Sequence, residues 1–349
     1  MTALTALAVP KTLVEALDPD WLSEALAPVT GGRRVTAVET VEVIRTVATK
    51  VRFTAAFDGA EGGREAFCLK GLLDVDAAGA AGGSTTVLEC DFYDKLASKL
   101  SVRVPKCVAT IVDRDAPNGV FIMRDLVAGG GQFCSALDAF TANQAAQSLD
   151  QLAALHAGSD MLDDLPWVGR RASALANSSY VTTEMLQELL DGPRGETLSP
   201  AIRNAVRLRA AMKILAARDE VTPDFLIHGD AHAGNIFRTA DGAGLIDWQL
   251  LQRGGWALDV AYHVAAVLPV EVAEASERDL LDHYLDRMKG LGATMPDREA
   301  AWAEYRAAPA YGYFLWGITR RVDPAIINVF TARLGASVTR HDSFALLGV

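Results

Sequence analysis

The chain has 349 residues, of which 50% are hydrophobic and 22% are charged, and this balance excludes an intrinsically disordered or low-complexity protein. Its length suits two domains or two lobes, because domains typically contain about 100–200 residues. With 33 Lys and Arg against 44 Asp and Glu the net charge is −11, and basic residues gather only in short pairs such as Arg170-Arg171, which argues against a nucleic-acid-binding protein.

Cysteine usage and hydropathy predict a cytoplasmic protein with no membrane partner. The cysteines Cys68, Cys90, Cys107 and Cys134 are scattered and form no CxxC pattern, which is typical of reduced thiols in a cytosolic chain. The best apolar stretch, 260–270, is too short to span a bilayer. The apolar segment at the start of the sequence has no basic residue before it and no clear cleavage site, so it does not read as a secretory signal.

The first third of the chain is predicted to form an antiparallel sheet. Strand-like runs are rich in β-branched residues, and a Gly-containing turn at 58–63 separates two of them. An Ala/Gly-rich loop at 76–84 then precedes a segment in which apolar residues recur at helical spacing. The predicted elements are a helix at 11–26, strands at 35–43, 51–57, 65–69, 107–113 and 120–124, and a helix at 85–99.

Beyond Gly129-Gly130-Gly131 the pattern of apolar residues becomes helical. The predicted helices occupy 141–157, 184–190, 199–217, 271–291 and 298–317. This change of pattern predicts an α+β protein with a β-rich N-terminal lobe at 1–126 and a mostly helical C-terminal lobe at 127–349, joined by a hinge near 123–126.

The most informative segment contains a predicted β-hairpin. Ala240-Asp241-Gly242 is a hairpin turn signal between two strand-like runs. When the hairpin is centred on Asp241, Asn235 faces Asp247 at the open end. Asp230 lies five residues before Asn235, on the loop that enters the hairpin.

This arrangement predicts a site for phosphoryl transfer. An amide oxygen and a carboxylate side by side suit a hard cation such as Mg²⁺, which takes few protein ligands and fills its other positions with phosphate and water. A nearby carboxylate that does not bind the metal can accept the proton of a hydroxyl group. The same three roles occur in kinases, and the Asp-x4-Asn spacing of Asp230 and Asn235 matches a kinase catalytic loop.

The chain resembles the aminoglycoside phosphotransferase and choline kinase superfamily, and most closely its ecdysteroid-kinase-like (CHK-like) branch, in three ordered motifs: HGDAHAGN at 228–235, GLIDWQ at 244–249 and RGGWALDVAYH at 253–263. The resemblance extends from about residue 41 to the C-terminus. It implies a two-lobed protein-kinase-like fold, with a small antiparallel N-lobe and a large helical C-lobe. It also implies that ATP and Mg²⁺ are cofactors and that the γ-phosphoryl group is transferred to the hydroxyl of a small-molecule alcohol.

In the C-lobe the resemblance assigns a role to five residues. Asp230 is expected to be the catalytic base that orients the acceptor hydroxyl. Asn235 and Asp247 are expected to bind the Mg²⁺ that bridges the ATP phosphates. His228 would brace the catalytic loop, and Asp259 would anchor that loop from the following helix.

In the N-lobe the resemblance points to residues that bind the nucleotide. Lys70 would hold the α- and β-phosphates and pair with Glu89, and Met123 would belong to the hinge that offers backbone groups to adenine. The turn after the first strand, where kinases carry a Gly-rich loop, contains no glycine. Thr46, Thr49 and backbone N–H groups are therefore expected to contact the phosphates in its place.

Three alternatives stay open on the sequence. His228, Asp230 and His232 form a His-x-Asp-x-His cluster that could bind Zn²⁺ in a metal-dependent hydrolase. The missing glycine loop is compatible with a catalytically silent nucleotide-binding protein. Among kinases, the motif resemblance favours a lipophilic or steroid-like acceptor, with aminoglycosides and choline-type alcohols as runner-up substrates. The aromatic residues of 298–317 would form core or, by the same resemblance, line the acceptor site.

Overall fold

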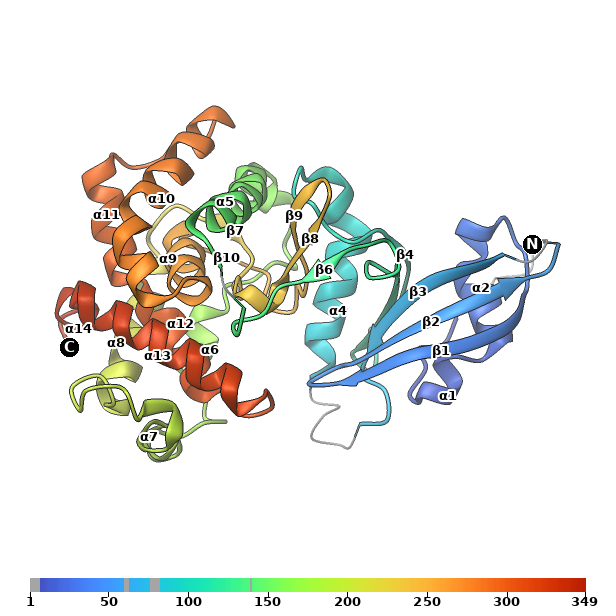
Figure 1. Ribbon diagram of the computed structural model, residues 1–349, viewed down its shortest axis with the longest axis horizontal. Coiled ribbons are helices and arrows are strands. Elements are labelled where there is room, and N and C mark those ends of the chain that lie inside the picture. The colour runs from blue at the N-terminus through green and yellow to red at the C-terminus, as the bar shows by residue number, and fades with distance from the viewer. Residues whose placement is uncertain (1–6, 60–62, 76–81, 139) are drawn as a thin grey trace. The chain divides into compact units, whose positions relative to one another are not determined.

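The structure consists of two units, and the first of them is built on an antiparallel sheet (Figure 1). The computed structural model describes residues 7–59, 63–75, 82–138 and 140–349. The first unit comprises Met1–Lys99 and Val104–Gln132, and the second comprises Leu100–Arg103 and Phe133–Val349. The turn expected at 58–63 and the loop expected at 76–84 lie partly outside the described residues.

The sheet of the first unit has five strands in the order β1-β2-β3-β5-β4, and each neighbouring pair is antiparallel. The strands are β1 (Val35–Arg45), β2 (Thr49–Phe57), β3 (Arg64–Gly71), β4 (Cys107–Asp113) and β5 (Asn118–Arg124). All five predicted strands are present. Four of them extend by one or two residues at one or both ends, because the hydrogen-bonded ladder continues into the turns.

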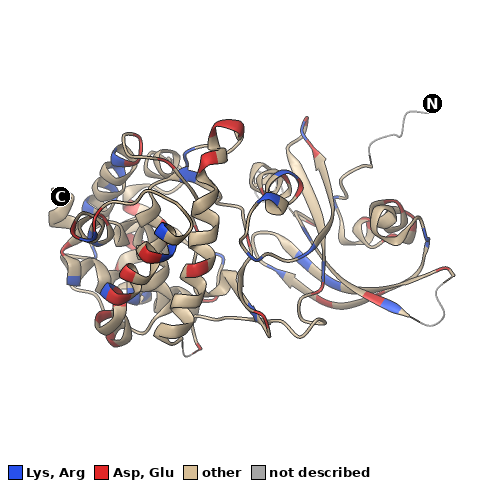
Figure 2. Cartoon of the chain, turned by 90° about the horizontal axis from the view of Figure 1, so that it is seen from above, with Lys and Arg blue, Asp and Glu red and all other residues tan. Residues whose placement is uncertain are grey.

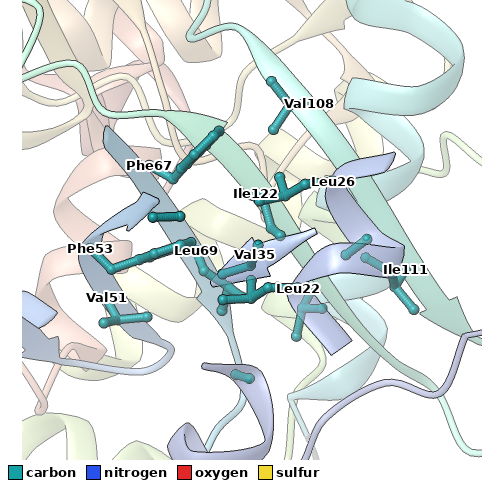
Figure 3. Close-up of a cluster of buried hydrophobic side chains, with 14 of the residues drawn as sticks. Leu22, Leu26, Val35, Val51, Phe53, Phe67, Leu69, Val108, Ile111 and Ile122 are labelled. Carbon is teal, nitrogen blue, oxygen red and sulfur yellow. The ribbon is translucent and has the colours of Figure 1, made fainter. Parts of the chain in front are cut away.

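The core of the first unit lies between the sheet and helix α2 (Pro19–Thr30) (Figure 3). Leu22 and Leu26 of this helix belong to one buried cluster with Phe53, Leu69 and Ile122 of the sheet. Burial of each such side chain stabilises the fold by about 1.5–3 kcal/mol relative to leaving it exposed. The apolar face of α2 therefore holds the helix on the sheet.

The prediction of one helix at 11–26 is wrong, because the chain forms two helices there. Helix α1 (Leu13–Ala16) is a single turn. The Asp18 side chain then accepts hydrogen bonds from the backbone N–H groups of Asp20 and Trp21, which caps α2, and Pro19 occupies the first helical position. Proline is favoured at that position and unfavourable inside a helix, so the Asp-Pro pair begins a new helix.

The helix predicted at 85–99 is present, but its hydrogen-bond pattern changes along its length. It begins as α4 (Gly83–Asp91), widens into a π-helical segment η1 (Phe92–Leu96) and ends as a 3-10 turn η2 (Ala97–Lys99). Phe92 and Leu96 are fully buried. A π-helical turn contains more residues than an α-helical one, so it changes the direction in which the following side chains project.

The second unit is mostly helical, as expected. Its helices are α5 (Ala142–His156), α6 (Ala172–Ala176), α7 (Thr183–Asp191), α8 (Ala205–Asp219), α9 (Trp256–Val267), α10 (Val270–Gly290), α11 (Arg298–Ala307), α12 (Pro309–Ile318), α13 (Pro324–His341) and α14 (Ser343–Leu346), with 3-10 segments η3 (Ala157–Asp164), η4 (Pro193–Gly195) and η5 (Ala233–Asn235). Its short strands are β7 (Phe225–Ile227), β8 (Ile236–Thr239), β9 (Gly242–Leu245) and β10 (Gln252–Gly254), and β6 (Gln132–Phe133) lies where the chain enters this unit.

Two predicted helices of the second unit differ from the structure. The helix expected at 298–317 is two helices, α11 and α12, because Pro309 starts a new helix. The helix expected at 199–217 begins only at Ala205, where the Asn204 side chain accepts a hydrogen bond from the Arg207 N–H. Every residue of α9 is buried. A helix buried all round has no polar face, so apolar periodicity does not reveal it.

Acidic and basic residues are interspersed along the helices of the second unit (Figure 2). Arg298, for example, lies 2.5 Å from Asp282 and 2.8 Å from Asp286. Exposed pairs of this kind typically contribute less than about 1 kcal/mol each. Among the described residues, no helix is both long enough and apolar enough to cross a bilayer.

Asp219 is a buried acid at the end of α8. Its carboxylate accepts a hydrogen bond from the Gly255 N–H and lies 3.7 Å from the Arg170 guanidinium. Burial raises the pKa of Asp219 to about 6, against the opposing effects of Gly255 and Arg170. The folded state therefore keeps a proton that the unfolded chain has lost between roughly pH 4 and pH 6, so stability falls as the pH rises through this window.

Replacing Asp219 by Asn should remove this pH-dependent loss. The Asp219→Asn amide oxygen can still accept the Gly255 N–H, but it carries no charge that burial penalises. The free energy of unfolding of the variant should therefore exceed that of the wild type by more at about pH 7.5 than at about pH 4.5. The difference between the two pH values should be up to roughly 3 kcal/mol. Thermal or urea unfolding at the two pH values measures the difference. An equal difference at both values would contradict the assignment.

Candidate active site

The predicted hairpin is present as β8 and β9, but its register differs from the prediction by one residue. Ile236 pairs with Leu245, and the turn between the strands has two residues instead of three. The carbonyl of Asn235 accordingly accepts a hydrogen bond from the N–H of Ile246 at 3.0 Å. Asp247 is thus not opposite Asn235 and lies one residue further along the chain.

The backbone at Asp247 leaves the strand in a left-handed conformation, with φ of 69°. This conformation is uncommon outside glycine, and Asp is among the residues that adopt it most readily. Ile246 is hydrogen-bonded to Asn235, so its neighbour Asp247 lies at the same end of the hairpin. Burial, and then the charge of Asp247, raise the pKa of Asp230. A one-residue error in the predicted register therefore did not separate the residues of the site.

Asn235 is tied to Asp230 through its amide nitrogen. Nδ2 of Asn235 donates to the Asp230 carbonyl oxygen at 2.9 Å and lies 3.3 Å from Asp230 Oδ2. Because the nitrogen faces Asp230, the side-chain oxygen of Asn235 is left as a group that can bind a cation. The structure thus brings together the three residues Asp230, Asn235 and Asp247 that the sequence singled out.

The carboxylate of Asp230 is largely enclosed, with 15% of its side chain exposed. Tyr262 Oη donates a hydrogen bond to Oδ1 at 3.0 Å. Burial, and then the charge of Asp247, raise the pKa of Asp230 to about 6, although His228, Tyr262 and Asn235 act in the opposite direction. A carboxylate with a pKa this close to neutrality is a better proton acceptor than an ordinary aspartate.

The loop that carries Asp230 is held by a buried carboxylate on α9. Asp259 accepts hydrogen bonds from the backbone N–H of His228 at 2.6 Å and of Gly229 at 2.8 Å, and it lies 3.1 Å from His156 Nε2. Burial acts to raise the pKa of Asp259, but the hydrogen bond with His156 and those from the loop outweigh it and lower the pKa. The carboxylate of Asp259 is thus kept charged and anchors two successive residues of the loop.

His228 braces the same loop with both ring nitrogens. Nε2 lies 3.0 Å from the Ile246 carbonyl oxygen, and Nδ1 accepts the N–H of Asp230 at 3.2 Å. The ring is fully buried and packs on Trp248, with 4.7 Å between ring centroids. Because both nitrogens are occupied by backbone groups, His228 cannot be a zinc ligand, and the His-x-Asp-x-His hypothesis of a zinc hydrolase is wrong.

Gly229 is required between these two residues. Its φ is 79°, and a Cβ at this position would lie 2.3 Å from the carbonyl oxygen of Leu250. Any side chain would have to displace this backbone or open the loop. The glycine therefore allows the loop to bond to Asp259 and at the same time to pack against the backbone at Leu250.

Three further residues hold the loop and were not identified from the sequence. His263 Nδ1 lies 2.8 Å from the Ala231 carbonyl oxygen. Tyr311 Oη donates to the Gly229 carbonyl at 2.7 Å, and Tyr262 contacts Asp230 as described above. All three side chains are fully buried. Tyr262 and His263 lie within the DVAYH motif, close to Asp259, and this was the sequence signal that could have identified them. Only the structure of α9 shows which atoms of the loop they contact.

In the first unit, Lys70 and Glu89 form a buried ion pair. Lys70 Nζ lies 2.7 Å and 3.0 Å from the two carboxylate oxygens of Glu89, and the side chains are 5% and 2% exposed. Lys70 belongs to β3 and Glu89 to α4. Such a pair costs desolvation and rarely stabilises a fold strongly, so its presence is more readily explained by a role in orienting the ammonium group.

The two threonines expected at the phosphates have other partners. Thr49 is buried, and its hydroxyl donates to the Leu73 carbonyl at 3.2 Å. The hydroxyl of Thr46 donates to the Ala48 carbonyl at 3.1 Å, inside the turn between β1 and β2. Both hydroxyl protons are used within the first unit, so the expected contacts of these hydroxyls with phosphate have no support in the structure.

Met123, expected in the hinge, lies within β5. It is opposite Cys68 of β3 and Cys107 of β4. The strand ends at Arg124, and the N–H of Asp125 still donates to the Ala66 carbonyl at 3.1 Å. The segment 123–126 thus begins inside the sheet, and its contact with adenine stays a prediction.

Solved structures with a kinase-like fold are similar to this chain. A Plasmodium vivax ethanolamine kinase aligns with a TM-score of 0.50 at 16% identity, over 87% of this chain and 82% of that one. A choline/ethanolamine kinase family protein from Mesorhizobium loti aligns with a TM-score of 0.51 at 16% identity, over 94% and 98%. The GDP complex of aminoglycoside 2'-phosphotransferase-IIIa aligns with a TM-score of 0.50 at 13% identity, over 93% and 99%. These similarities confirm the expected fold.

The sequence itself gives the class of protein. No curated protein matches it. The model of the phosphotransferase enzyme family, in contrast, matches residues 86–305, which is more than half of the chain and contains Glu89, the catalytic-type loop and the hairpin. The predicted superfamily is therefore confirmed, and the chain belongs to the phosphotransferase enzyme family.

Proposed function

We propose that the protein transfers the γ-phosphoryl group of ATP to the hydroxyl of a small-molecule alcohol. The observation that supports this most directly is the grouping of Asp230, Asn235 and Asp247 on one anchored loop and hairpin. The family match supports a phosphotransferase, and the solved neighbours include choline and ethanolamine kinases and aminoglycoside phosphotransferases.

Asp230 would act as the catalytic base. As the acceptor oxygen forms its bond to the γ-phosphorus, the bond from this phosphorus to the bridging oxygen of ATP breaks, and ADP leaves. The proton of the hydroxyl passes to the carboxylate of Asp230. The raised pKa of Asp230 favours this step, and most of the acceleration would come from positioning and electrostatics.

Asn235 and Asp247 would bind Mg²⁺. The donor set fits this ion, because an amide oxygen and a carboxylate are hard oxygen ligands and two of them suffice when phosphates and water supply the rest. Burial, and then the charge of Asp247, raise the pKa of Asp230, and a bound cation would relieve the repulsion between the two carboxylates. When bound, the ion would neutralise the charge of the phosphates.

Lys70 would bind the α- and β-phosphates of ATP. Its ammonium group is fixed by Glu89 and lies 5.9 Å from the centre of the Phe121 ring. A cation held in one orientation can meet a phosphate without losing further side-chain entropy. This buried, paired lysine and the tuned carboxylate of Asp230 favour an active kinase over a catalytically silent nucleotide-binding protein.

The acceptor would be a lipophilic alcohol. His232 lies 3.7 Å from Asp230 Oδ2, and its ring contacts Trp316 and Phe330 with centroid distances of 5.2 and 5.1 Å. Trp316 and Phe330 also pack on one another at 4.2 Å. Trp316 and Phe330 are themselves buried, so they form an apolar support behind His232 and not a surface that an acceptor could contact. The preference for a lipophilic acceptor therefore rests on the motif resemblance. Choline-type and aminoglycoside acceptors are the alternative, favoured by the structural neighbours.

Substituting Asp230 by Asn should greatly slow transfer but spare nucleotide binding. Loss of the base should lower kcat by about 10²–10⁴-fold, since this is the typical contribution of general base catalysis. ADP release with Mg-ATP and a panel of choline, ethanolamine, an aminoglycoside and a hydroxysteroid measures the rate, and stabilisation against heat by Mg-ATP measures binding. Asp241→Asn is the matched control, because Asp241 is 86% exposed at the tip of the same hairpin. Wild-type turnover in Asp230→Asn would refute the base.

Substituting Asp247 by Asn should raise the Mg²⁺ concentration needed for half-maximal rate. Removal of the charged ligand should increase this concentration at least about tenfold. Changing a residue that only supports a metal ligand already lowers metal affinity by about 10–100-fold. Initial rates measured against Mg²⁺ at fixed ATP give this concentration, and excess Mg²⁺ should restore part of the rate. An unchanged Mg²⁺ dependence would mean that Asp247 is not a ligand.

A further inference from the structure

Two buried aromatic side chains form a hydrogen-bonded chain that ends on the carboxylate of Asp230. The indole Nε1 of Trp316 in α12 donates to Tyr262 Oη at 2.7 Å. Tyr262 in α9 donates in turn to Asp230 Oδ1 at 3.0 Å. Tyr262 is fully buried and Trp316 is 4% exposed. Neither hydrogen bond has a part in the transfer reaction as described above.

The direction of this hydrogen-bonded chain is fixed by the chemistry of its members. An indole nitrogen only donates and an ionised carboxylate only accepts. Tyr262 Oη must therefore accept from Trp316 and send its own proton to Asp230. Burial, followed by the charge of Asp230, raises the pKa of Tyr262 well above its ordinary value, so the hydroxyl stays protonated and remains a donor.

The two oxygens of Asp230 consequently have different surroundings. Oδ1 receives the Tyr262 hydroxyl. Oδ2 lies 3.3 Å from Asn235 Nδ2 and 3.7 Å from His232 Nε2, and both contacts are longer than that hydrogen bond. The tighter contact on Oδ1 fixes the rotation of the carboxylate and leaves Oδ2 as the oxygen that can face an incoming hydroxyl.

The Trp316 end of the hydrogen-bonded chain is itself held in place. Arg194 Nη1 donates to the carbonyl oxygens of Trp316, Gly317 and Thr319 at 2.9, 2.8 and 2.8 Å. These carbonyls lie at the end of α12, where helical partners are missing. The guanidinium therefore closes the helix end and fixes the position of the indole.

We propose that Tyr262 is a positioning residue that sets the orientation of Asp230 for proton transfer, and that Trp316 acts through Tyr262 by fixing the direction of its hydroxyl. The inference rests on the proposed function, because it needs Asp230 to be the base. It adds a requirement beyond the metal and phosphate ligands. Oδ1 is held by the shorter hydrogen bond from Tyr262, so that Oδ2, which has the longer contacts with Asn235 and His232, is presented to the acceptor.

Tyr262→Phe should lower kcat by about tenfold to a hundredfold, with no change in KM for Mg-ATP. A small misplacement of a reacting group typically causes a loss of rate of this size. The assay is release of inorganic phosphate from Mg-ATP with water as the acceptor, so that no alcohol has to be identified. Trp316→Phe should lower kcat less, because the Tyr262 hydroxyl remains but can rotate. The double variant should equal Tyr262→Phe, since Trp316 acts only through that residue.

Tyr313→Phe is the matched control. Tyr313 also lies on α12 and is fully buried, but its hydroxyl donates to the Ile202 carbonyl at 3.0 Å. Its removal should lower the unfolding midpoint about as much as Tyr262→Phe while leaving kcat unchanged. In the Asp230→Asn background, Tyr262→Phe should cause no further loss of kcat, because the carboxylate that it orients is absent.

The outcomes separate the two proposals. The proposed function would be overturned if the wild type transferred phosphate neither to water nor to any alcohol of the panel above, or if phosphate release were unchanged in Asp230→Asn. A rate that depends on Asp230 but not on Tyr262 would overturn only the positioning role. The positioning role would also be overturned if Tyr262→Phe and Tyr313→Phe lowered kcat equally. It would be overturned as well if Tyr262→Phe lowered the residual rate of Asp230→Asn, because either outcome would indicate a general structural effect. Trp316→Phe supplies the test independently if Tyr262→Phe does not fold.

Discussion

The geometry of the site depends on one buried carboxylate that receives two successive backbone N–H groups. Asp259 holds His228 and Gly229, and the loop can meet it only because Gly229 adopts a positive φ. A charge that is buried in this way is costly unless its hydrogen bonds are complete. The contact with His156 supplies the remaining partner. The hydrogen bonds that keep Asp259 ionised therefore also fix the backbone directly before Asp230.

Residues of the site could be found from the sequence because their chemistry requires particular side chains. Asp230, Asn235 and Asp247 were identified by spacing and residue type, and they do lie together. The register could not be obtained in the same way, since a turn of two residues and one of three leave the same local signal. Asp247 nevertheless stays at the same end of the hairpin as Asn235 in spite of the shift, because its neighbour Ile246 is hydrogen-bonded to the Asn235 carbonyl.

Other errors share a physical origin, which is that tertiary contacts decide between local choices of similar energy. The breaks before Pro19 and Pro309 are visible in the sequence, but an unbroken apolar pattern favoured one helix in each case. The hydrogen bond from the Thr49 hydroxyl to the Leu73 carbonyl likewise joins two distant segments, and the type of residue 49 does not indicate this partner. Contacts between residues distant in sequence, such as Trp316 with Tyr262, leave no periodic signal at all.

Helix α9 supports the loop at three successive points. Asp259 holds its start, Tyr262 meets Asp230, and His263 reaches the carbonyl of Ala231. Each residue of a helix is rotated by about 100° from the previous one. Inserting or deleting a single residue between Gly255 and Asp259 would therefore turn all three side chains away from their partners at once. Over evolutionary time this segment should tolerate exchanges of its apolar residues far better than any change in its length.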